Sequence, residues 1–467
     1  SISKKDREGI LKSIDRCTVK KTIQQSPEFI VEAVNVLEKD SSFVFKEFSN
    51  QESKTFILGK DRCLEETIAK MTSKLNQLGI KIEISSWRNP VPNVWSVHIR
   101  DADSPLCYTN GKGATKLSAL CSALGEYFER LSNNYFYNDY YLGEEISNSK
   151  FVHYPNEKWF PVPEDNSMPE ELMDKNLLET YSNDNELMPW HLVDTNSGNS
   201  KRGICAIPFI RQSDNKTIYI PVNLIGNLFV SNGMSAGNTK YEARVQCLSE
   251  IFERAVKNNI ISNEISLPTI PLSVLNNYPE IVAGIQELES KGFPVLVKDA
   301  SLGGKYPVAC VALMNPRTGG VFASFGSHPK LEIALERSLT ELLQGRSFEG
   351  LNDVPPPTFN HYAVKEPNNL VDHFIDSTGI ISWKFFKDEP DFKFSSWDYS
   401  GSTEDEFDYL INILKNLNKE IYIADYDDLG VAACRVLVPN YSEIYNNEDL
   451  IWDNNNKSLL TNLFTII

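Results

Sequence analysis

Five polar residues share one face of a predicted helix in the middle of the chain. The segment N-T-K-Y-E-A-R-V-Q-C-L-S-E-I-F-E-R occupies residues 238–254, and these polar residues are Asn238, Glu242, Gln246, Glu250 and Glu253. At about 100° per residue, their side chains fall within an arc of roughly 120°. An ordinary surface helix pairs glutamate with lysine four residues later. Three carboxylates without such partners repel one another unless water or a cation lies between them, so the spacing indicates a cation site.

The same spacing occurs twice more. The segment S-A-L-G-E-Y-F-E-R keeps four of the offsets, with Ser122, Glu126, Glu129 and Arg130 in the places of Gln246, Glu250, Glu253 and Arg254. A degenerate copy keeps three offsets, at Arg337, Glu341 and Gln344. A single E-x-x-E-R is more often a solvated helix face than a site. Two full copies and a partial one favour a site.

The chemistry of these residues suits a hard divalent cation. Apolar residues lie between the acids in each copy, so we expect the acids to point inward or into a cleft. The pairs Glu126 with Glu129 and Glu250 with Glu253, placed on facing helices, supply carboxylate oxygens. Mg²⁺ takes oxygen ligands and keeps water or phosphate oxygens in its other positions. The acids show no cysteine or histidine spacing of a zinc site.

Two segments before the first acid helix invite a phosphate-binding interpretation. A strand is expected to run into Gly59, followed by a helix over residues 63–75, with Lys60 and Thr67 at and just inside its start. That position offers an ammonium, backbone N–H groups and a hydroxyl to an anion. A surface lysine and an N-terminal helix threonine are the simpler alternative. The segment G-K-G-A-T-K at 111–116 is not a P-loop, because G-x-x-x-x-G-K-[ST] is absent. It is expected to turn the chain from a strand at 106–109 into the helix of Ser122.

The rest of the chain predicts alternating strands and helices, which is typical of an α/β fold with mixed sheets. Strands are expected at 205–210, 217–224, 294–298, 309–314 and 321–326, and helices at 282–291 and 331–345. A final unit, after a linker at 345–358, has a helix at 404–417 and strands at 420–424 and 432–438.

Composition excludes several classes of partner. The chain has 467 residues and a net charge of −17, which disfavours binding of a naked nucleic acid. We expect no membrane span and no signal peptide. The eight cysteines form no C-x-x-C pair, which indicates reduced thiols in a cytoplasmic protein. A homodimer is one oligomeric state compatible with these features.

At these motifs the sequence resembles the YcaO family. The family signature has S-x-x-x-E-x-x-E-R, then N-x-x-x-E-x-x-x-Q-x-x-x-E-x-x-E-R, then R-x-x-x-E-x-x-Q, and all three occur here in that order. The match extends from about Phe56 to Asp449 and includes the segments 89–101, 109–116 and 230–239. It is most similar to the stand-alone type found in gammaproteobacteria. The resemblance implies the YcaO fold, with an ATP site between the motif helices.

The resemblance also implies a chemistry, the ATP-dependent activation of an amide. In the family, a peptide carbonyl attacked by a side chain or by sulfide becomes an oxyanion, takes the γ-phosphoryl group of ATP and then loses phosphate. By position, Mg²⁺ would be held by Glu126, Glu129, Glu250 and Glu253, which are the catalytic and metal residues of this prediction. ATP would contact Lys60, Thr67, Ser122, Asn238, Glu242, Gln246, Arg254, Arg337 and Glu341. Arginine suits phosphate because its guanidinium stays charged and offers paired donors; Arg130 is left outside this set.

The biological role implied by the stand-alone relatives is that of an accessory factor. They are associated with β-methylthiolation of an aspartate in a small-subunit ribosomal protein, so the expected partners are a ribosomal protein and a methylthiotransferase. Azoline-forming members end in a proline-rich tail, whereas this chain ends S-L-L-T-N-L-F-T-I-I, which disfavours heterocycle formation. Two alternatives stay open: a nucleotide-binding partner protein without phosphoryl transfer, and a redox-linked module.

The redox alternative depends on the first residues. The segment D-R-C-T-V-K-K-T around Cys17 is similar to the end of OsmC-type thiol peroxidases, and some YcaO proteins carry such a domain. We therefore expect residues 1–50 to be the remnant of an OsmC-like domain plus a linker, 51–449 a YcaO domain, and 450–467 a tail, truncated like the N-terminus. A plain helix followed by a linker is nearly as good an explanation. Cys17 without its partner cannot run a peroxide cycle.

Overall fold

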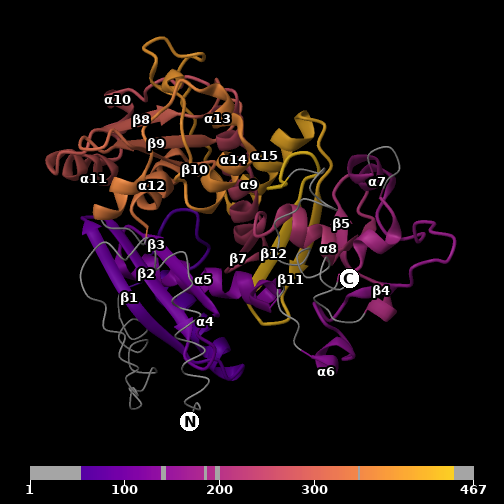
Figure 1. Ribbon diagram of the computed structural model, residues 1–467. Helices are drawn as coiled ribbons and strands as arrows, with labels where there is room; N and C mark the ends of the chain where they lie inside the picture. Colours follow the sequence, from indigo (N-terminus) through magenta and orange to yellow (C-terminus); the bar gives the residue numbers. More distant parts are fainter. Residues whose placement is uncertain (1–53, 138–142, 183–186, 195–199, 345–347, 446–467) are drawn as a thin grey trace, which may run out of the picture. The chain divides into compact units, whose positions relative to one another are not determined.

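The computed structural model describes residues 54–137, 143–182, 187–194, 200–344 and 348–445. The chain divides into two units, residues 1–43 and 44–467, and all described residues belong to the second. The predictions for residues 1–50 and 450–467, including Cys17, lie outside the described residues. In the described part, the strands form three sheets whose neighbouring strands are all antiparallel (Figure 1). The predicted mixture of α-helices and sheets is confirmed.

The first sheet is a three-stranded meander covered by two helices. It consists of β1 (Ile82–Val91), β2 (Val94–Asp101) and β3 (Tyr108–Gly113), and the helices are α4 (Leu64–Gln77) and α5 (Lys116–Ser132). Their apolar faces meet in one core, to which α5 contributes Leu120, Leu124 and Phe128. Because a Cβ on Gly111 would lie 2.0 Å from the carbonyl oxygen of Ala119, only glycine lets β3 pack this closely on α5.

The second sheet is buried on both faces. It contains β8 (Val295–Asp299), β9 (Val308–Met314) and β10 (Val321–Ser327), with β9 in the middle. Alternate residues of β9 face opposite sides, as the pleat of a strand requires. Ala309, Val311 and Leu313 pack toward α11 (Pro279–Ser290) and α12 (Leu331–Leu342). Val308 and Cys310 pack toward the long helix α9 (Lys240–Ser262).

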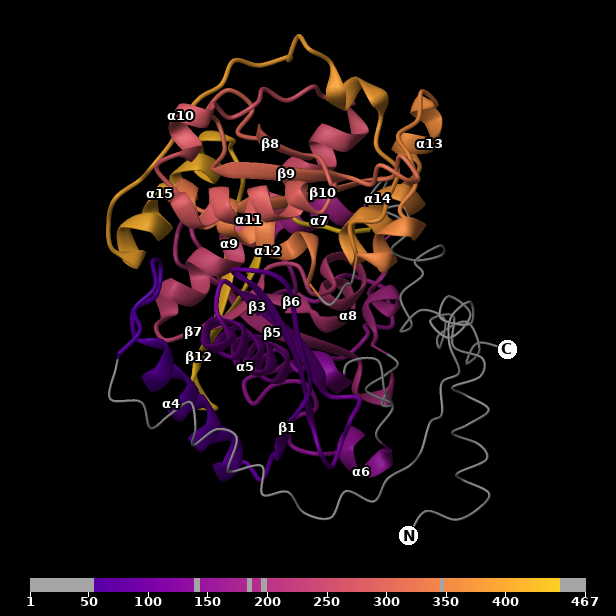
Figure 2. The ribbon, with the colours of Figure 1, turned by 90° about the vertical axis from the view of Figure 1, so that its left-hand side faces the viewer.

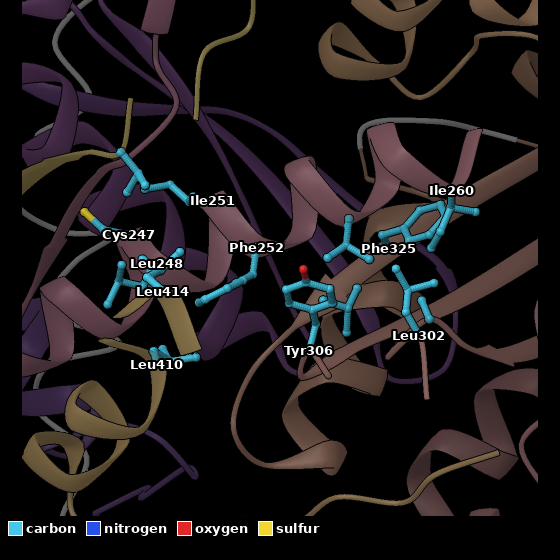
Figure 3. Close-up of a cluster of buried hydrophobic side chains, with 14 of the residues drawn as sticks. Cys247, Leu248, Ile251, Phe252, Ile260, Leu302, Tyr306, Phe325, Leu410 and Leu414 are labelled. Atoms are coloured by element: carbon cyan, nitrogen blue, oxygen red, sulfur yellow. The ribbon is translucent and has the colours of Figure 1, made fainter. Parts of the chain in front are cut away.

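The helix α9 packs through its apolar face into the largest core of the described residues. Phe252 is fully buried, and its ring centroid lies 6.0 Å from those of Tyr306 and Tyr441 (Figure 3). Leu410 and Leu414 of α15 (Thr403–Asn416) complete the contact on the same side. This packing leaves the opposite, polar face of α9 directed away from the core.

The third sheet has six strands. Its order is β4 (Lys158–Phe160), β5 (Ile204–Arg211), β11 (Tyr422–Tyr426), β12 (Ala432–Leu437) and β7 (Met234–Gly237), and β6 (Thr217–Pro221) pairs with β5. The last two strands of the described chain therefore lie between strands from its middle (Figure 1). Figure 2 shows β12 beside β7. The final helix and two strands that the sequence predicts after residues 345–358 are confirmed as α15, β11 and β12, and the two strands complete this sheet.

The starts of the two acid helices are defined by capping side chains. At α9, the Thr239 hydroxyl accepts a hydrogen bond from the Glu242 N–H at 3.1 Å. At α5, Thr115 and Ser118 form a reciprocal capping box with two bonds of 3.0 Å. Such caps satisfy N–H groups that have no partner within the helix. Each helix therefore begins at a defined residue, which sets the direction of its acidic face.

Two strand predictions differ from the structure. No strand runs into Gly59: the Thr55 carbonyl accepts from the Leu64 N–H at 2.9 Å, so this segment joins the start of α4 instead of a sheet. The strand expected at 217–224 ends at Pro221, and the chain continues into α8 (Val222–Leu224) and the π-helical turn η5 (Ile225–Phe229). The pairing of β1 with β2 was not predicted.

The remaining elements are short and connect these layers. They are η1 (Tyr135–Tyr137), α6 (Glu144–Ser147), α7 (Lys175–Tyr181), η3 (Pro189–Leu192), η4 (Ser200–Arg202), α10 (Leu272–Leu275), η6 (Glu349–Asp353), α13 (His361–Lys365), α14 (Pro367–Ile375) and η7 (Trp383–Phe386). Among the described helices, none combines the length and the apolar character needed to cross a membrane.

Candidate functional site

The polar faces of α5, α9 and α12 line one cavity together with β3 and the start of α4. Its volume is about 370 Å³. Twelve of the thirteen predicted site residues lie in its wall: Lys60, Thr67, Ser122, Glu126, Glu129, Glu242, Gln246, Glu250, Glu253, Arg254, Arg337 and Glu341. The thirteenth, Asn238, lies just behind the wall. The three motif helices, which are far apart in the sequence, thus bring their polar residues to the same space.

One end of the cavity is built around the buried carboxylate of Glu242. It accepts hydrogen bonds from the Asp61 N–H and from the Asn238 amide, both at 3.0 Å, and it pairs with Lys60 at 3.2 Å. The hydroxyl of Thr67 in turn donates to the Asn238 oxygen at 2.9 Å. Burial alone would raise the pKa of Glu242, but Lys60 and these hydrogen bonds outweigh it and lower the pKa. Glu242 and Asn238 therefore hold the segment at Lys60 in place.

The acids of α5 and α9 lie in the middle of the wall, beside arginines from their own helices. Arg130 approaches Glu126 at 3.2 Å and Glu129 at 3.6 Å, and Arg254 donates to Glu250 at 3.0 Å. Burial raises the pKa of Glu129 well above its usual value in spite of Arg130, and the charge of Glu250 adds to that rise. The two acid pairs are thus close enough to repel each other across the cavity. One more positive charge between them would relieve this repulsion.

The pKa of Glu253 is raised, like that of Glu129. Burial raises the pKa of Glu253, which Lys112 and Arg254 offset only in part. Within the described residues, no three acidic, histidine or cysteine side chains already come together as a metal site. Magnesium in nucleotide sites is commonly held by one or two carboxylates plus phosphate oxygens, so it does not need a preformed cage of protein ligands. The buried, mutually repelling glutamates fit such an ion.

Two further cations, Arg337 and Lys112, line the cavity. Arg337 donates to the Ser327 carbonyl at 2.9 Å and to the side chain of Gln246, so α12 and α9 are joined across the wall. Lys112 enters from β3 and pairs with Glu341. Burial lowers the pKa of Lys112 to about 8, so the ammonium is mostly protonated at neutral pH. The charges of Glu253 and Glu250 act on both cations, so acids and cations lie close together in this wall, which suits a polyanion bound together with a metal ion.

Three residues of this wall were missed by the sequence reasoning. Lys112 was interpreted only as part of a turn, but residues 111–113 belong to β3 and direct the ammonium into the cavity. His328 also lies in the wall, and burial lowers its pKa well below the usual value, so the ring is neutral. Glu336, whose pKa burial raises, also lies there. The motif G-K-G could have indicated a role for Lys112, whereas no sequence motif marks His328 or Glu336.

Comparisons with known proteins agree with this arrangement. The family described as YcaO cyclodehydratase, binding ATP and Mg²⁺, matches residues 110–442. A protein of Escherichia coli named ribosomal protein S12 methylthiotransferase accessory factor YcaO is 59% identical over 403 residues, covering 86% of this chain and 69% of that protein. A Haemophilus influenzae protein without an assigned role is 58% identical over 405 residues, covering 87% and 69%.

Two solved structures share the fold. One is YcaO from Methanopyrus kandleri bound with AMPPCP and Mg²⁺, with a TM-score of 0.52 and 17% identity, covering 87% of this chain and 96% of that one. The other is a heterocyclase in complex with substrate and cofactor, with a TM-score of 0.54 and 18% identity over 84% of this chain. The chain spans about half, 54%, of the length of that heterocyclase.

Fold and site together define a mixed α/β protein whose motif helices enclose a cavity lined by buried acids and cations. The sequence matches above then identify it: the chain belongs to the YcaO family, whose cofactors are ATP and Mg²⁺. The matched residues 110–442 lie inside the predicted domain at 51–449, whose boundaries stay a prediction.

Proposed function

We propose that this protein binds and hydrolyses ATP with Mg²⁺ and thereby activates a peptide or protein amide by phosphorylation. We further propose that it does so as an accessory factor for the methylthiolation of ribosomal protein S12. The role is supported by the Escherichia coli relative, which is named for it and is 59% identical. The chemistry is supported by one observation above the others: acids of α5, α9 and α12 line a single cavity of about 370 Å³ together with Lys60, Lys112, Arg130, Arg254 and Arg337.

The acids are the proposed magnesium ligands. Glu126 and Glu129 of α5 and Glu250 and Glu253 of α9 would hold the metal, which when bound neutralises charge on the phosphates. The raised pKa of Glu129 and that of Glu253 mark where the wall has surplus negative charge. The arginines that pair with Glu126 and Glu250 hold these carboxylates in the wall.

The cations are the proposed phosphate contacts. The guanidinium of Arg254 lies 4.2 Å from the ring of Phe374 and donates to the Phe374 carbonyl at 3.3 Å, so its plane is held while its other face stays beside the cavity. Arg337 is held by two acceptors, as described above. Arginines fixed in this way lose little further freedom when they bind an oxyanion. Lys60 and Lys112 each add one positive charge to the wall.

The polar uncharged residues are proposed to orient the nucleotide. Thr67 and Asn238 form a hydrogen-bonded pair behind Lys60, and Ser122 lies in the wall one turn before Glu126. Gln246 contacts Arg337, and Glu341 contacts Lys112. Gln246 and Glu341 would therefore position these two cations instead of binding the phosphate themselves. Glu242 acts in the same way on Lys60.

The test is ATP turnover on the intact protein, alone and with ribosomal protein S12 and its methylthiotransferase. Glu250→Gln keeps an oxygen for Arg254 but removes the charge, and we expect a loss of about 100-fold or more, as for removal of other groups that stabilise transferring phosphate. Glu332→Gln is the matched control, because Glu332 is exposed on α12. Wild-type turnover in Glu250→Gln contradicts the assignment.

Isotope transfer separates the amide-activating enzyme from a plain ATPase. If a substrate amide labelled with heavy oxygen passes its label to the released phosphate, the amide has been phosphorylated. Turnover that releases only unlabelled phosphate in the presence of both partners contradicts amide activation. Nucleotide-dependent partner binding without any turnover selects the alternative, a nucleotide-binding partner protein.

A further inference from the structure

A second, smaller cavity lies between β5, the π-helical turn η5 and the strands β11 and β12. Its volume is about 50 Å³. A cavity needs roughly 10–15 Å³ of such space to hold one water, so this one accommodates a few waters or one small ion and excludes a nucleotide. Its polar wall is formed by the side chains of Asn133, Tyr135, His153, Tyr426 and Arg435.

Arg435 of β12 is the feature that requires an explanation. It is 6% exposed, and its Nε has no hydrogen-bond partner. Its terminal nitrogens reach only neutral acceptors, the Val230 carbonyl and, at 3.4 Å, the sulfur of Met234. Among the described residues, no carboxylate lies within ion-pairing distance of it. Arg130 is the charged group nearby, and it is also positive. A buried guanidinium without a counter-charge destabilises a fold strongly, so something should compensate it.

The backbone around Arg435 is strained. Val230, whose carbonyl accepts from Arg435, has φ of +52°, a conformation that a β-branched residue rarely adopts. It follows directly on the π-helical turn Ile225–Phe229. Residues in such conformations persist only where their surroundings hold them, and π-helical turns occur often at binding sites. The strain aims the Val230 carbonyl at the guanidinium and leaves its Nε side facing the cavity residues.

A second buried polar atom without a hydrogen-bond partner limits the kind of ligand that this cavity can bind. The Oδ1 of Asn133 is buried without a partner, whereas its Nδ2 donates to the Glu129 carbonyl at 2.9 Å. The cavity wall therefore offers both a charged donor, Arg435, and a neutral acceptor, Asn133. An anion that also carries a hydroxyl satisfies both.

We propose that this cavity binds one small hydroxyl-bearing oxyanion, of the size of bicarbonate or hydrogen phosphate, on Arg435. The inference does not depend on the proposed function, because the two cavities have separate walls. They are neighbours, however: Arg130 lies in the wall of the larger cavity, and its guanidinium is 4.6 Å from the ring of Tyr135 in the wall of the smaller one.

The test is anion-dependent thermal unfolding of the full chain, without nucleotide, at constant ionic strength. Bicarbonate and inorganic phosphate should each raise the unfolding temperature in a saturable way. Acetate, which lacks the hydroxyl, should bind about tenfold more weakly, the effect of one unmade hydrogen bond. If the true ligand is a carboxylate on a peptide, acetate should bind more tightly than bicarbonate and phosphate. That order of affinities overturns the proposal of a hydroxyl-bearing anion.

Variants show which of the two cavities binds the anion. Arg435→Met removes the buried charge and keeps the length, so it should raise the unfolding temperature in anion-free buffer and abolish the anion-dependent shift. Arg254→Gln, in the larger cavity, should leave the bicarbonate shift unchanged. If Arg435→Met does not fold, Val222→Phe fills the smaller cavity and keeps the arginine, and it should also lose the shift. A shift that survives both changes in the smaller cavity, or that disappears only in Arg254→Gln, overturns the proposal.

Discussion

Replacing Glu242 by glutamine tests how the first turn of α9 is attached to the segment before α4. The Glu242 side chain is almost fully buried and accepts from the Asp61 N–H and the Asn238 amide at 3.0 Å, with Lys60 at 3.2 Å. Glutamine keeps the size and one oxygen but not the charge. This change therefore removes the ion pair and weakens one or two hydrogen bonds without creating a cavity.

We expect Glu242→Gln to lower the free energy of unfolding by about 2–4 kcal/mol, because a hydrogen bond to a charged group contributes about 1.5–3 kcal/mol. The Lys60 pair adds little, since that side chain is 30% exposed and screened by solvent. Burial opposes ionisation of Glu242, but its partners outweigh burial and hold its pKa below 4.5 in the folded state. The stabilisation is thus complete above the unfolded pKa and is lost as the pH falls through the folded pKa.

Urea unfolding followed by tryptophan fluorescence measures this difference at neutral pH and at a series of lower values. Glu332→Gln serves as the control, since it removes an exposed carboxylate of α12. The gap between wild type and Glu242→Gln should narrow below about pH 4.5, where the carboxylate takes up a proton. A variant within about 0.5 kcal/mol of wild type at neutral pH, or a gap that widens on acidification, refutes the reasoning.

Two further predictions concern the helix that carries the acids. Phe252→Ala should lower the free energy of unfolding by about 3–5 kcal/mol in urea titrations, because it leaves a cavity beside Tyr306 and Tyr441; a loss below about 1 kcal/mol contradicts the packing. Burial lowers the pKa of Lys257 from 10.5 to about 8, so the unfolded chain binds more protons between these values and stability rises with pH there. In Lys257→Met, the rise of the free energy of unfolding with pH should be smaller by up to about 1.4 kcal/mol per pH unit. Urea unfolding at a series of pH values measures this, and a variant whose stability changes with pH as in the wild type contradicts the prediction.

The sequence predicted the site best where its signal is local. The offsets of Glu242, Gln246 and Glu250 follow from the geometry of one helix, so their common face was predictable without any knowledge of the fold. The residues that this helix face meets in the folded protein were not predictable in this way. Lys112 and Arg435 project from strands and contact residues that lie far away in the chain, Glu341 and Val230 respectively. No periodicity encodes such a meeting.

The fold was predicted less well where apolar runs have no clear period. Residues 217–224 are apolar enough to predict a strand, but the strand ends at Pro221 and the chain continues into a short helix and the π-helical turn. The hairpin of β1 and β2 was missed because its first strand is only partly buried and does not alternate, with Trp87, Asn89 and Pro90 in its second half. The position of β11 and β12 inside a sheet that begins with β4 depends on long-range pairing, which local propensity does not contain.

The central claim is that glutamates from α5 and α9 hold the magnesium ion of a bound nucleotide. Calorimetric titration of ATP into the full chain, with and without Mg²⁺, tests it most directly. In the wild type Mg²⁺ should strengthen ATP binding. In Glu250→Gln that gain should fall by at least about tenfold while metal-free binding to the cations stays. A Mg²⁺ effect of equal size in wild type, Glu250→Gln and the Glu332→Gln control contradicts the account.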